Sequence, residues 1–344
     1  MDYAELLDRY GSMIESDLKE QFSQLIENSR GYHPFIAYAY GTLGEFVLRG
    51  GRRLSACSTL MAYKAYTNEI DERIVKVSSG IELYRHSILA HDDIADDETM
   101  RRGGRTLHEA FADGRDRHSG SGSAIFAGNI LYSLAIKSVM DSGFEDDRLA
   151  EVAGLLSSDY KDINESQMLD LLFEYTEPSV EEWRIMAGKR AASLFRTSML
   201  TGAVLAGAPA DDRRILEDAA RNIGYAFDIQ DDIIDTFASK EQYGRDPCGD
   251  ITKRKKPLHI IIAMERNPRL ESIMKAGHEL TEAKIREIQE IVRSSGALDA
   301  AKSISREHAQ EAEKAIDRTG MNSEAKDFFV SFIRYVDESL DWYR

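Results

Sequence analysis

The chain has 344 residues, a formal net charge of −16 at pH 7, and hydrophobic residues at 42% of its positions. This composition supplies a sizeable core, while the acidic balance argues against general affinity for nucleic acid or anionic membranes, since phosphate contacts require a basic surface. The two cysteines, Cys57 and Cys248, lie far apart without metal-ligand spacing, which indicates a reducing compartment and no zinc site.

The N-terminal segment does not resemble a targeting signal. Residues 1–5 lack a basic region followed by an apolar one, and no apolar run approaches the roughly 18 residues of a membrane span. We therefore expect a soluble, cytoplasmic protein without a membrane span. With 6 prolines and no Pro/Gly/Ser-rich linker, residues 1–344 are predicted to form a single domain.

Helical periodicity runs through almost the whole chain. Apolar residues recur every three or four positions, and no segment shows convincing strand alternation. The predicted helices cover residues 4–28, 35–48, 54–66, 72–96, 124–141, 147–173, 180–206, 213–237, 257–265, 282–294, 298–317 and 323–342. We therefore predict an all-α fold, a single large helical bundle whose core can hold a ligand cavity between facing helices.

Local signals support the ends of these helices. Ser179 with Glu182 forms a capping box, and Thr281 and Asn322 stand where an N-cap residue belongs. The predicted breaks between helices lie at residues 50–51, 103–104, 114–122, 207–209 and 244–257.

The apolar segment that begins at Val75 ends in a run of carboxylates. Helical geometry places Asp92 and Asp96 on one side, one turn apart, with Asp93 about 100° round. Like charges at this spacing destabilise a helix by about a few tenths of a kcal/mol per pair, so a neutralising cation is expected. The alternative is a solvated acidic face.

A second copy of the pattern, Asp231-Asp232-Ile233-Ile234-Asp235, lies on another apolar helical segment. Two copies inside apolar helices argue against a merely solvated face. Mg²⁺ prefers a few carboxylates together with substrate phosphate oxygens. The two motifs therefore predict a diphosphate clamp with six candidate metal ligands, Asp92, Asp93, Asp96, Asp231, Asp232 and Asp235.

Positive charge gathers at the helix breaks. Arg52-Arg53 follows Gly50-Gly51, Arg101-Arg102 follows the first acidic motif, and residues 253–256 follow the second. Each cluster could be a solvated face, and residues 253–256 could be a nuclear-import signal. Because the arginine fork suits phosphate oxygens, basic clusters beside acidic motifs favour a diphosphate pocket.

Residues 40–265 resemble the trans-type prenyl diphosphate synthases, or polyprenyl synthetases. The resemblance rests on His86 and the motif at 91–96, Arg101-Arg102-Gly103, Gln167 with Asp170, Ser193-Leu194-Phe195, Phe227 with the motif at 230–235, and Gly249-Asp250 with Lys255. It implies an all-α helical bundle of the isoprenoid synthase type with a central substrate cavity, working as a homodimer. In this family an allylic prenyl diphosphate, held by Mg²⁺, ionises to a carbocation. Isopentenyl diphosphate then attacks this carbocation head to tail.

The resemblance also implies roles for individual residues. Asp92, Asp96 and Asp231 would be the chief metal ligands, supported by the other three aspartates. Arg101 and Lys255 would hold the allylic diphosphate. The diphosphate of isopentenyl diphosphate would be held by Arg52, Arg53, His86 and Arg102. A buried core histidine is the alternative for His86, and His91 is interpreted as structural.

Several positions depart from the family pattern. In the GGKxxR motif, Arg52 replaces the lysine and Ser55 the second arginine. Arg190-Ala191 stands for Lys-Thr, Asp228 for a glutamine, and Asn129 for an aspartate. Arg190 keeps a positive charge for catalysis and substrate binding, while Asp228 adds a carboxylate beside the carbocation.

These departures leave three functions open. The first is an ordinary prenyl diphosphate synthase. The second is a terpene cyclase-like enzyme or non-standard prenyltransferase that ionises its substrate without isopentenyl diphosphate. The third is a regulatory partner subunit, which the intact aspartates of both motifs disfavour.

Product length is predicted from two residues before the first motif. Ser87 and Tyr84 lie five and eight positions before Asp92, on nearly the same side of the helix and about one turn apart. In the family, a bulky side chain at the first position closes the product tunnel early. Ser87 leaves that level open and Tyr84 becomes the next candidate floor, predicting a C20–C25 product, with geranylgeranyl diphosphate first. Packing of Tyr84 in the core or a dimer contact is the alternative.

Overall fold

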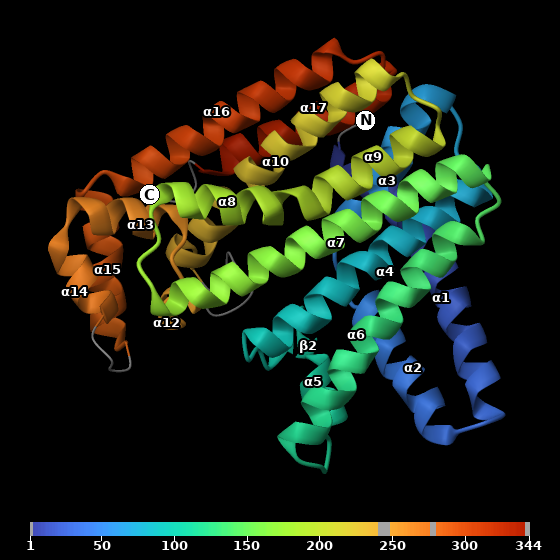
Figure 1. The fold of residues 1–344 in the computed structure, drawn as a ribbon, viewed down its shortest axis with the longest axis horizontal. Helices are drawn as coiled ribbons and strands as arrows, with labels where there is room; N and C mark the ends of the chain where they lie inside the picture. Colours follow the sequence, from blue (N-terminus) through green and yellow to red (C-terminus); the bar gives the residue numbers. More distant parts are fainter. Residues whose placement is uncertain (1–2, 240–247, 276–279, 341–344) are drawn as a thin grey trace. The chain divides into compact units, whose positions relative to one another are not determined.

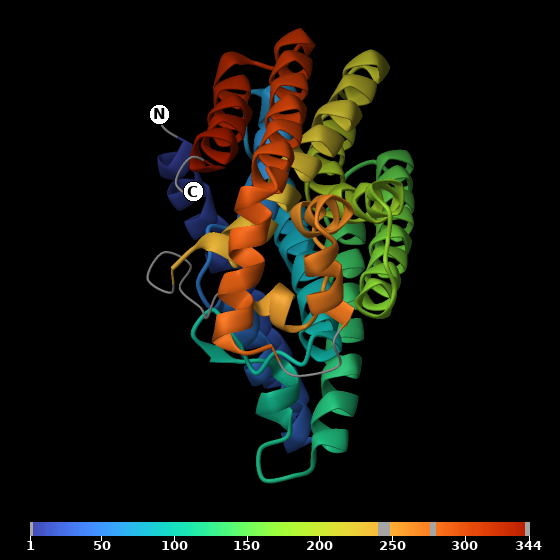
Figure 2. The same cartoon turned by 90° about the vertical axis from the view of Figure 1, so that its left-hand side faces the viewer.

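The computed structural model describes residues 3–239, 248–275 and 280–340, and of Ala192 and Ser193 it describes the backbone alone. Both views, Figure 1 and Figure 2, show helices almost throughout the described chain, which confirms the all-α fold class. The described strands are β1 (Met100–Arg101) and β2 (Gly104–Arg105), which pair antiparallel in one short hairpin. The chain divides into two compact units, and the single domain over residues 1–344 stays a prediction.

Unit 1 comprises Met1–Ser157, Thr197–Arg213 and Gly320–Phe328. Its helices are α1 (Tyr3–Arg30), α2 (Pro34–Leu48), α3 (Leu54–Thr67), α4 (Glu72–Ala95), α5 (Leu107–Phe111), α6 (Arg117–Met140) and α9 (Thr197–Leu205). Helix α4 packs along α6, as Figure 1 shows, and α3 packs against α9. The second contact depends on Gly202, because a Cβ there would lie 2.3 Å from the Thr59 carbonyl oxygen.

Unit 2 comprises Ser158–Arg196, Arg214–Thr319 and Phe329–Arg344. Its elements are α8 (Val180–Ala191), the π-helix η1 (Ala192–Arg196), α12 (Gly249–Thr252), α13 (Leu258–Arg266), α14 (Pro268–Lys275), α15 (Glu282–Ser294) and α16 (Ala297–Arg318). Trp183, Ile233 and Ile260 belong to its buried apolar cluster. Burying side chains of this size contributes about 1.5–3 kcal/mol each. This core fixes the helices that carry the second acidic motif.

Three further helices contribute residues to both units. They are α7 (Asp146–Tyr175), α10 (Ala210–Phe237) and α17 (Ser323–Ser339). The second acidic motif lies near the end of α10, within unit 2.

The predicted helix starts at three positions are confirmed. The Ser179 N–H donates to the Glu182 carboxylate at 2.8 Å, and the Glu182 N–H donates to Ser179 Oγ at 3.2 Å. Thr281 Oγ1 accepts a hydrogen bond from the Lys284 backbone N–H. Asn322 Oδ1 accepts one from Ala325 at 3.0 Å. These bonds satisfy backbone donors that a first helical turn otherwise leaves unpaired.

The break predicted over residues 114–122 is too long. Asp116 caps α6 by accepting the Ser119 N–H at 2.8 Å, so the helix begins at Arg117. Gly120 lies inside it because α5 approaches closely: a Cβ at Gly120 would lie 2.3 Å from the His108 carbonyl oxygen. This glycine therefore marks close helix packing rather than a turn.

Other differences involve elements without a strong periodic signal. The short helices α5, α12 and α14 and the β1–β2 hairpin were not predicted, and the helix predicted over 180–206 is interrupted by the π-helix η1. The predicted break at 244–257 falls partly outside the described residues.

Helix α6 contradicts the expectation that no apolar run approaches the length of a membrane span. Among the described helices, it alone is long and apolar enough to cross a bilayer, and 39% of its most apolar window is buried in the protein. It packs along α4 and against α5 within unit 1. Buried core helices often have such a composition, so length and hydropathy are weak signals here.

Candidate active site

The first acidic motif lies at the C-terminal end of α4. Asp93 is fully buried, whereas Asp92 and Asp96 are partly exposed. Carboxylates at a helix C-terminus oppose the helix dipole, which adds to their mutual repulsion. Burial raises the pKa of Asp93 to about 6, although the nearby Arg101 opposes this shift. The clustered carboxylates of this motif therefore favour the binding of a cation.

Arg101 supplies part of the positive charge that balances these carboxylates. Its Nε donates to Asp93 Oδ1, and its Nη2 donates to Asp92 Oδ2 at 3.3 Å. Arg101 lies on β1, and the hairpin holds it against the end of α4. The structure thus brings Arg101 to the first motif, as predicted.

The turn of this hairpin presents Arg102. Arg102 and Gly103 both have positive φ angles, 50° and 75°, which reverse the chain between β1 and β2. Arg102 Nη1 donates to the Gly50 carbonyl oxygen at 2.8 Å. Arg102 therefore ties the hairpin to the Gly50-Gly51 segment.

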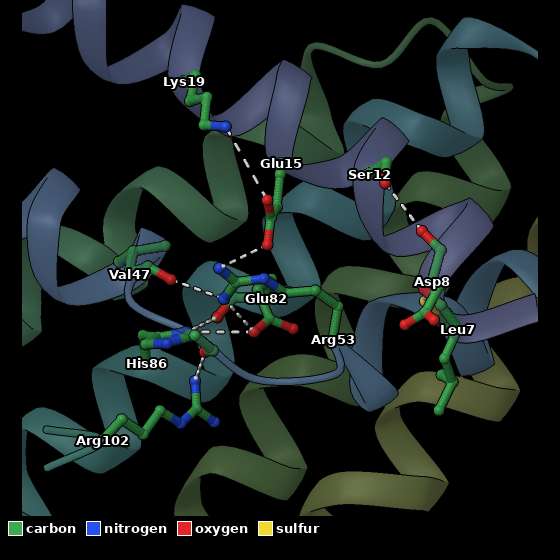
Figure 3. Close-up of polar contacts among 12 residues, drawn as sticks. Leu7, Asp8, Ser12, Glu15, Lys19, Val47, Arg53, Glu82, His86 and Arg102 are labelled. Atoms are coloured by element: carbon green, nitrogen blue, oxygen red, sulfur yellow. Dashed lines mark hydrogen bonds and ion pairs between the residues drawn. The ribbon is translucent and has the colours of Figure 1, made fainter. Parts of the chain in front are cut away.

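The guanidinium of Arg53 forms a buried network inside unit 1 (Figure 3). Its Nη1 donates to the Val47 carbonyl at 2.6 Å and to Glu82 Oε1 at 3.1 Å, while Nη2 lies 3.4 Å from Glu15 Oε1. A left-handed backbone at Arg53, with φ of 53°, turns its side chain inward at the start of α3. These internal partners correct the prediction that Arg53 holds a diphosphate directly and indicate a supporting role.

His86 lies one turn after Glu82 on α4 and beside it in Figure 3. Its Nδ1 is 2.8 Å from the Glu82 carbonyl oxygen, and its ring meets Phe46 edge-on with centroids 5.6 Å apart. Burial lowers the His86 pKa to about 4, so the ring is neutral at pH 7. A carbonyl accepts only from N–H, so Nδ1 carries the proton. Nε2 is buried and has no hydrogen-bond partner among the described residues.

A narrow pocket connects these features in unit 1. It is partly open to solvent, has about 170 Å³ of space between its atoms when that open solvent is included, and is lined by Phe46, Arg49, His86, Leu89, Arg101 and Arg102. The structure therefore gathers three predicted diphosphate-binding residues around one pocket. The predicted Arg52 is exposed and Ser55 is buried, and neither lines the pocket.

The second acidic motif, in unit 2, lies in a row of alternating charges. Arg190 on α8 pairs with Asp228 on α10 through two contacts, Nε to Oδ1 at 2.8 Å and Nη2 to Oδ2 at 2.9 Å. The same guanidinium lies 3.8 Å from both Asp170 and Asp232, and Lys255 Nζ lies 2.9 Å from Asp170. The structure thus brings Arg190, Asp228, Asp232 and Lys255 together, as the prediction requires.

The remaining aspartates of this motif differ in burial. Asp235 is buried and its Oδ2 accepts the Asp250 backbone N–H at 3.1 Å, whereas Asp231 is exposed. Asp250 was quoted in the family pattern without a role. Burial together with Asp235 raises the Asp250 pKa to about 7.

Burial and the neighbouring charges shift the pKa values of Asp232 and Asp170 in opposite directions. Burial raises the pKa of Asp232 well above its usual range, and Arg190 only partly opposes this. Burial also acts to raise the pKa of Asp170, but Arg190 and Lys255 together lower it below its usual range. Three carboxylates, of Asp170, Asp228 and Asp232, share the two cations Arg190 and Lys255. All three can therefore be ionised together only when further positive charge is bound.

The donor set suits Mg²⁺ because both motifs offer hard oxygen ligands. The Oδ2 atoms of Asp93 and Asp232 are buried and accept no hydrogen bond from the described residues. Within the described ranges, however, no three His, Cys, Asp or Glu side chains are grouped to hold an ion. The residues therefore fit ions bound by one or two carboxylates and completed by substrate oxygens, and they do not fit an all-protein cage.

The two residues predicted to set product length are both buried in α4. Ser87 Oγ donates to the Tyr84 carbonyl at 2.8 Å, and the Tyr84 ring lies 6.2 Å from the Tyr132 ring of α6. This position agrees with the packing alternative and also with a tunnel floor, so the role stays a prediction. His91 Nε2 lies 3.1 Å from the Ile125 carbonyl of α6, which agrees with its structural interpretation.

Sequence reasoning missed Arg49 and Glu82. A carboxylate inside an apolar helix, one turn before His86, is a signal that could have identified Glu82. Arg49 precedes the paired glycines and adds one more arginine to a basic cluster, which gives no separate signal.

Comparison with known proteins decides the family. The polyprenyl synthetase profile matches residues 38–294, three quarters of the chain. The chain belongs to the polyprenyl synthetase family. This polyprenyl synthetase is 30% identical to a geranylgeranyl diphosphate synthase of Methanosarcina mazei, covering 78% of this chain and 80% of that protein. It is 29% identical to a short chain isoprenyl diphosphate synthase of Methanocaldococcus jannaschii, covering 85% and 86% respectively.

Solved structures agree with this membership. Geranylgeranyl pyrophosphate synthetase of Pyrococcus horikoshii has a TM-score of 0.83 at 25% identity, covering 98% of this chain and 99% of that one. A Corynebacterium glutamicum geranylgeranyl pyrophosphate synthase, complexed with isoprenyl diphosphate and magnesium, has a TM-score of 0.86 at 22% identity and shows the shared fold. The match covers 94% of this chain and 98% of the Corynebacterium glutamicum chain. The polyprenyl synthetase is therefore an all-α prenyltransferase.

Proposed function

We propose that this polyprenyl synthetase condenses isopentenyl diphosphate with an allylic prenyl diphosphate to give a C20–C25 prenyl diphosphate, with geranylgeranyl diphosphate as the expected product. One observation carries the proposal: the unit 1 pocket gathers His86, Arg101 and Arg102 beside the first acidic motif. The relatives support the product range, since they include geranylgeranyl synthases and a geranylfarnesyl diphosphate synthase of Aeropyrum pernix, 28% identical over 86% of this chain and 92% of that protein.

In unit 1, we assign the diphosphate of isopentenyl diphosphate to Arg52, His86 and Arg102. Arg53 supports this site by holding Glu82, whose backbone carbonyl orients His86. Arg101 links the pocket to Asp92 and Asp93, which suits it to hold an allylic diphosphate at the motif.

In unit 2, we assign Lys255 and Arg190 to hold an allylic diphosphate. Lys255 is largely buried and paired with Asp170, which keeps its ammonium near the second motif. Preorganised cations of this kind stabilise the charge that develops on a departing diphosphate. The six motif aspartates would hold Mg²⁺, which when bound neutralises diphosphate oxygens.

We further propose a cytoplasmic homodimer that has no nucleic-acid or membrane partner. The net charge supports the absence of nucleic-acid and anionic-membrane partners. The family resemblance supports the homodimer, as do the apolar side chains Ile125 and Phe126 on α6, which are 43% and 70% exposed. A sedimentation mass equal to that of a monomer would contradict the homodimer.

The second candidate function is ionisation of an allylic diphosphate without isopentenyl diphosphate. It is favoured by the burial of Ser55, which leaves the pocket without the family's second arginine, and by the carboxylate of Asp228 beside Arg190. A regulatory subunit remains the third candidate.

One incubation separates the three functions. The pure protein is mixed with farnesyl diphosphate and Mg²⁺, with and without isopentenyl diphosphate, and the products are separated by chromatography. A longer prenyl diphosphate formed only with isopentenyl diphosphate supports the synthase. A hydrocarbon or alcohol formed without it supports the cyclase-like enzyme, and no turnover in either case supports the regulatory subunit.

A further inference from the structure

Arg49 extends from the C-terminal end of α2 into the unit 1 pocket. Its Nη1 donates to the carbonyl oxygens of Arg101 and Arg105, at 3.1 and 2.9 Å, and its Nη2 donates to Glu45 Oε1 at 3.1 Å. A guanidinium has five N–H donors, so these bonds use three of them. Among the residues that the structure describes, the Nε–H and one Nη2–H have no hydrogen-bond partner, so both can donate to a ligand.

The guanidinium of Arg49 is held in a fixed position. A Cβ at Gly104 would lie 2.2 Å from its Cζ, so the group occupies space that only glycine leaves open on β2. On its other side, Cζ lies 5.9 Å from the centre of the Phe46 ring, within the range of a cation–π contact. The side chain is 15% exposed. A cation fixed in this way binds an anion with little further loss of side-chain entropy.

Arg49 adds a positive charge to a pocket whose sequence lacks the second arginine of the family pattern. Ser55, where the family pattern has an arginine, is buried and does not line the pocket. Arg49 does line it, together with His86, Arg101 and Arg102. The His86 ring is neutral at pH 7 and Arg101 pairs with the acidic motif, so apart from Arg49 the positive charge that faces a diphosphate in this pocket comes from Arg102.

We propose that Arg49 binds the diphosphate of isopentenyl diphosphate directly and supplies the charge absent at Ser55. This inference rests on the proposed function and deepens it by naming an additional substrate-binding residue. The same guanidinium fixes the β1–β2 hairpin, so the tests must separate a direct contact from support of the hairpin.

The primary measurement is the dissociation constant of isopentenyl diphosphate, by isothermal titration calorimetry of the full chain without an allylic substrate. Arg49→Gln removes the charge and should weaken binding about ten- to a hundredfold, the effect of one charge-assisted contact. Arg105→Gln is the matched control, because Arg105 is exposed on β2 and donates to the Glu109 backbone carbonyl. It should change the constant less than about twofold.

A further variant distinguishes direct binding from hairpin support. Arg49→Lys keeps the charge but loses the planar fork that bridges two carbonyls, so direct binding predicts an affinity nearer to wild type than that of Arg49→Gln. Equal losses of affinity in Arg49→Lys and Arg49→Gln, accompanied by equal drops in melting temperature, would show that Arg49 only supports the hairpin.

Failure of the proposed function gives a different result. A wild-type protein that does not bind isopentenyl diphosphate overturns the condensation itself. A wild-type protein that binds it, with Arg49→Gln binding equally well, overturns only the role of Arg49. Melting temperatures of all variants establish that the folded proteins are being compared.

Discussion

Two departures from the family pattern form one interacting pair. Arg190 and Asp228 are 38 positions apart in the sequence, yet their side chains meet through two short contacts. The family's Lys and Gln at these positions carry one positive charge, whereas Arg and Asp together carry none. The substitution therefore lowers the local charge by one unit while fixing the guanidinium close to Asp232. Asp228 thus acts chiefly on Arg190. Their interaction was not predicted from the sequence, where the two residues were interpreted separately.

A double-mutant cycle on this pair tests the coupling. Asp228→Asn should lower kcat/KM for the allylic substrate about tenfold, because Arg190 loses its charged partner and its fixed position. Arg190→Gln should cost at least as much, and the double variant should lose little more than the worse single one. This corresponds to a coupling of about 0.5–3 kcal/mol.

The neighbouring pair Lys189 and Asp162 provides the control cycle. Its members are 2.9 Å apart and more exposed than Arg190 and Asp228. Their other salt bridges among the described residues are to Lys161 and Glu165, not to the second motif. Lys189→Gln and Asp162→Asn should leave kcat/KM nearly unchanged, singly and together. Additive losses at Arg190 and Asp228 would show that the two residues act independently.

At the scale of elements, the sequence predicted the long helices well because their apolar period and caps are local signals. It did not predict η1, α5 or the β1–β2 hairpin, whose geometry depends on contacts distant in the sequence. Neighbouring arginines show the same limit. Positive φ at Arg53 turns its side chain into the core while Arg52 stays exposed, and periodicity does not distinguish them.

Close helix packing gives a prediction for Gly202. Gly202→Ala places a Cβ about where the Thr59 carbonyl lies, so α9 and α3 must separate. We expect a loss of about 1–3 kcal/mol in the free energy of unfolding, measured by denaturant titration. Gly154→Ala is the control, because the exposed Gly154 of α7 has no atom near its missing Cβ. Alanine there should be neutral or stabilise by up to about 1 kcal/mol, and equal effects at both sites would contradict the packing argument.

The role of Tyr84, which lies on α4 beside Tyr132 of α6, can be tested through the length of the product. If Tyr84 forms the tunnel floor, Tyr84→Ala should lengthen the main product by about one isoprene unit, since one helical turn rises about 5.4 Å. Tyr84→Phe keeps the ring and should leave the length unchanged. Ser87→Phe is expected to shorten the product, although Ser87 is fully buried and the larger ring will also strain the core. Identical chromatograms for wild type and Tyr84→Ala would place the floor elsewhere.

For the whole molecule, the distribution of charge matters more than its sum. A chain with a net charge of −16 still places cations next to each acidic motif, Arg101 in unit 1 and Arg190 with Lys255 in unit 2. The spacing of the aspartates predicted both motifs from the sequence. It did not reveal that Asp93 and Asp235 are buried while Asp231 is exposed, because burial depends on the helices packed around each motif.

The two motifs should be separable by measuring binding and turnover in the same variants. Asp92→Ala and Asp231→Ala each remove a proposed metal ligand, so turnover should fall by several orders of magnitude while the circular dichroism spectrum stays that of the wild type. Binding of isopentenyl diphosphate should survive in Asp231→Ala, because every residue lining the unit 1 pocket lies in unit 1. Asp299→Ala removes an exposed carboxylate at the start of α16 and serves as the control for lost negative charge. Near-normal turnover in Asp92→Ala would exclude the metal clamp, and loss of isopentenyl diphosphate binding in Asp231→Ala would show that the pocket in unit 1 is not sufficient for it.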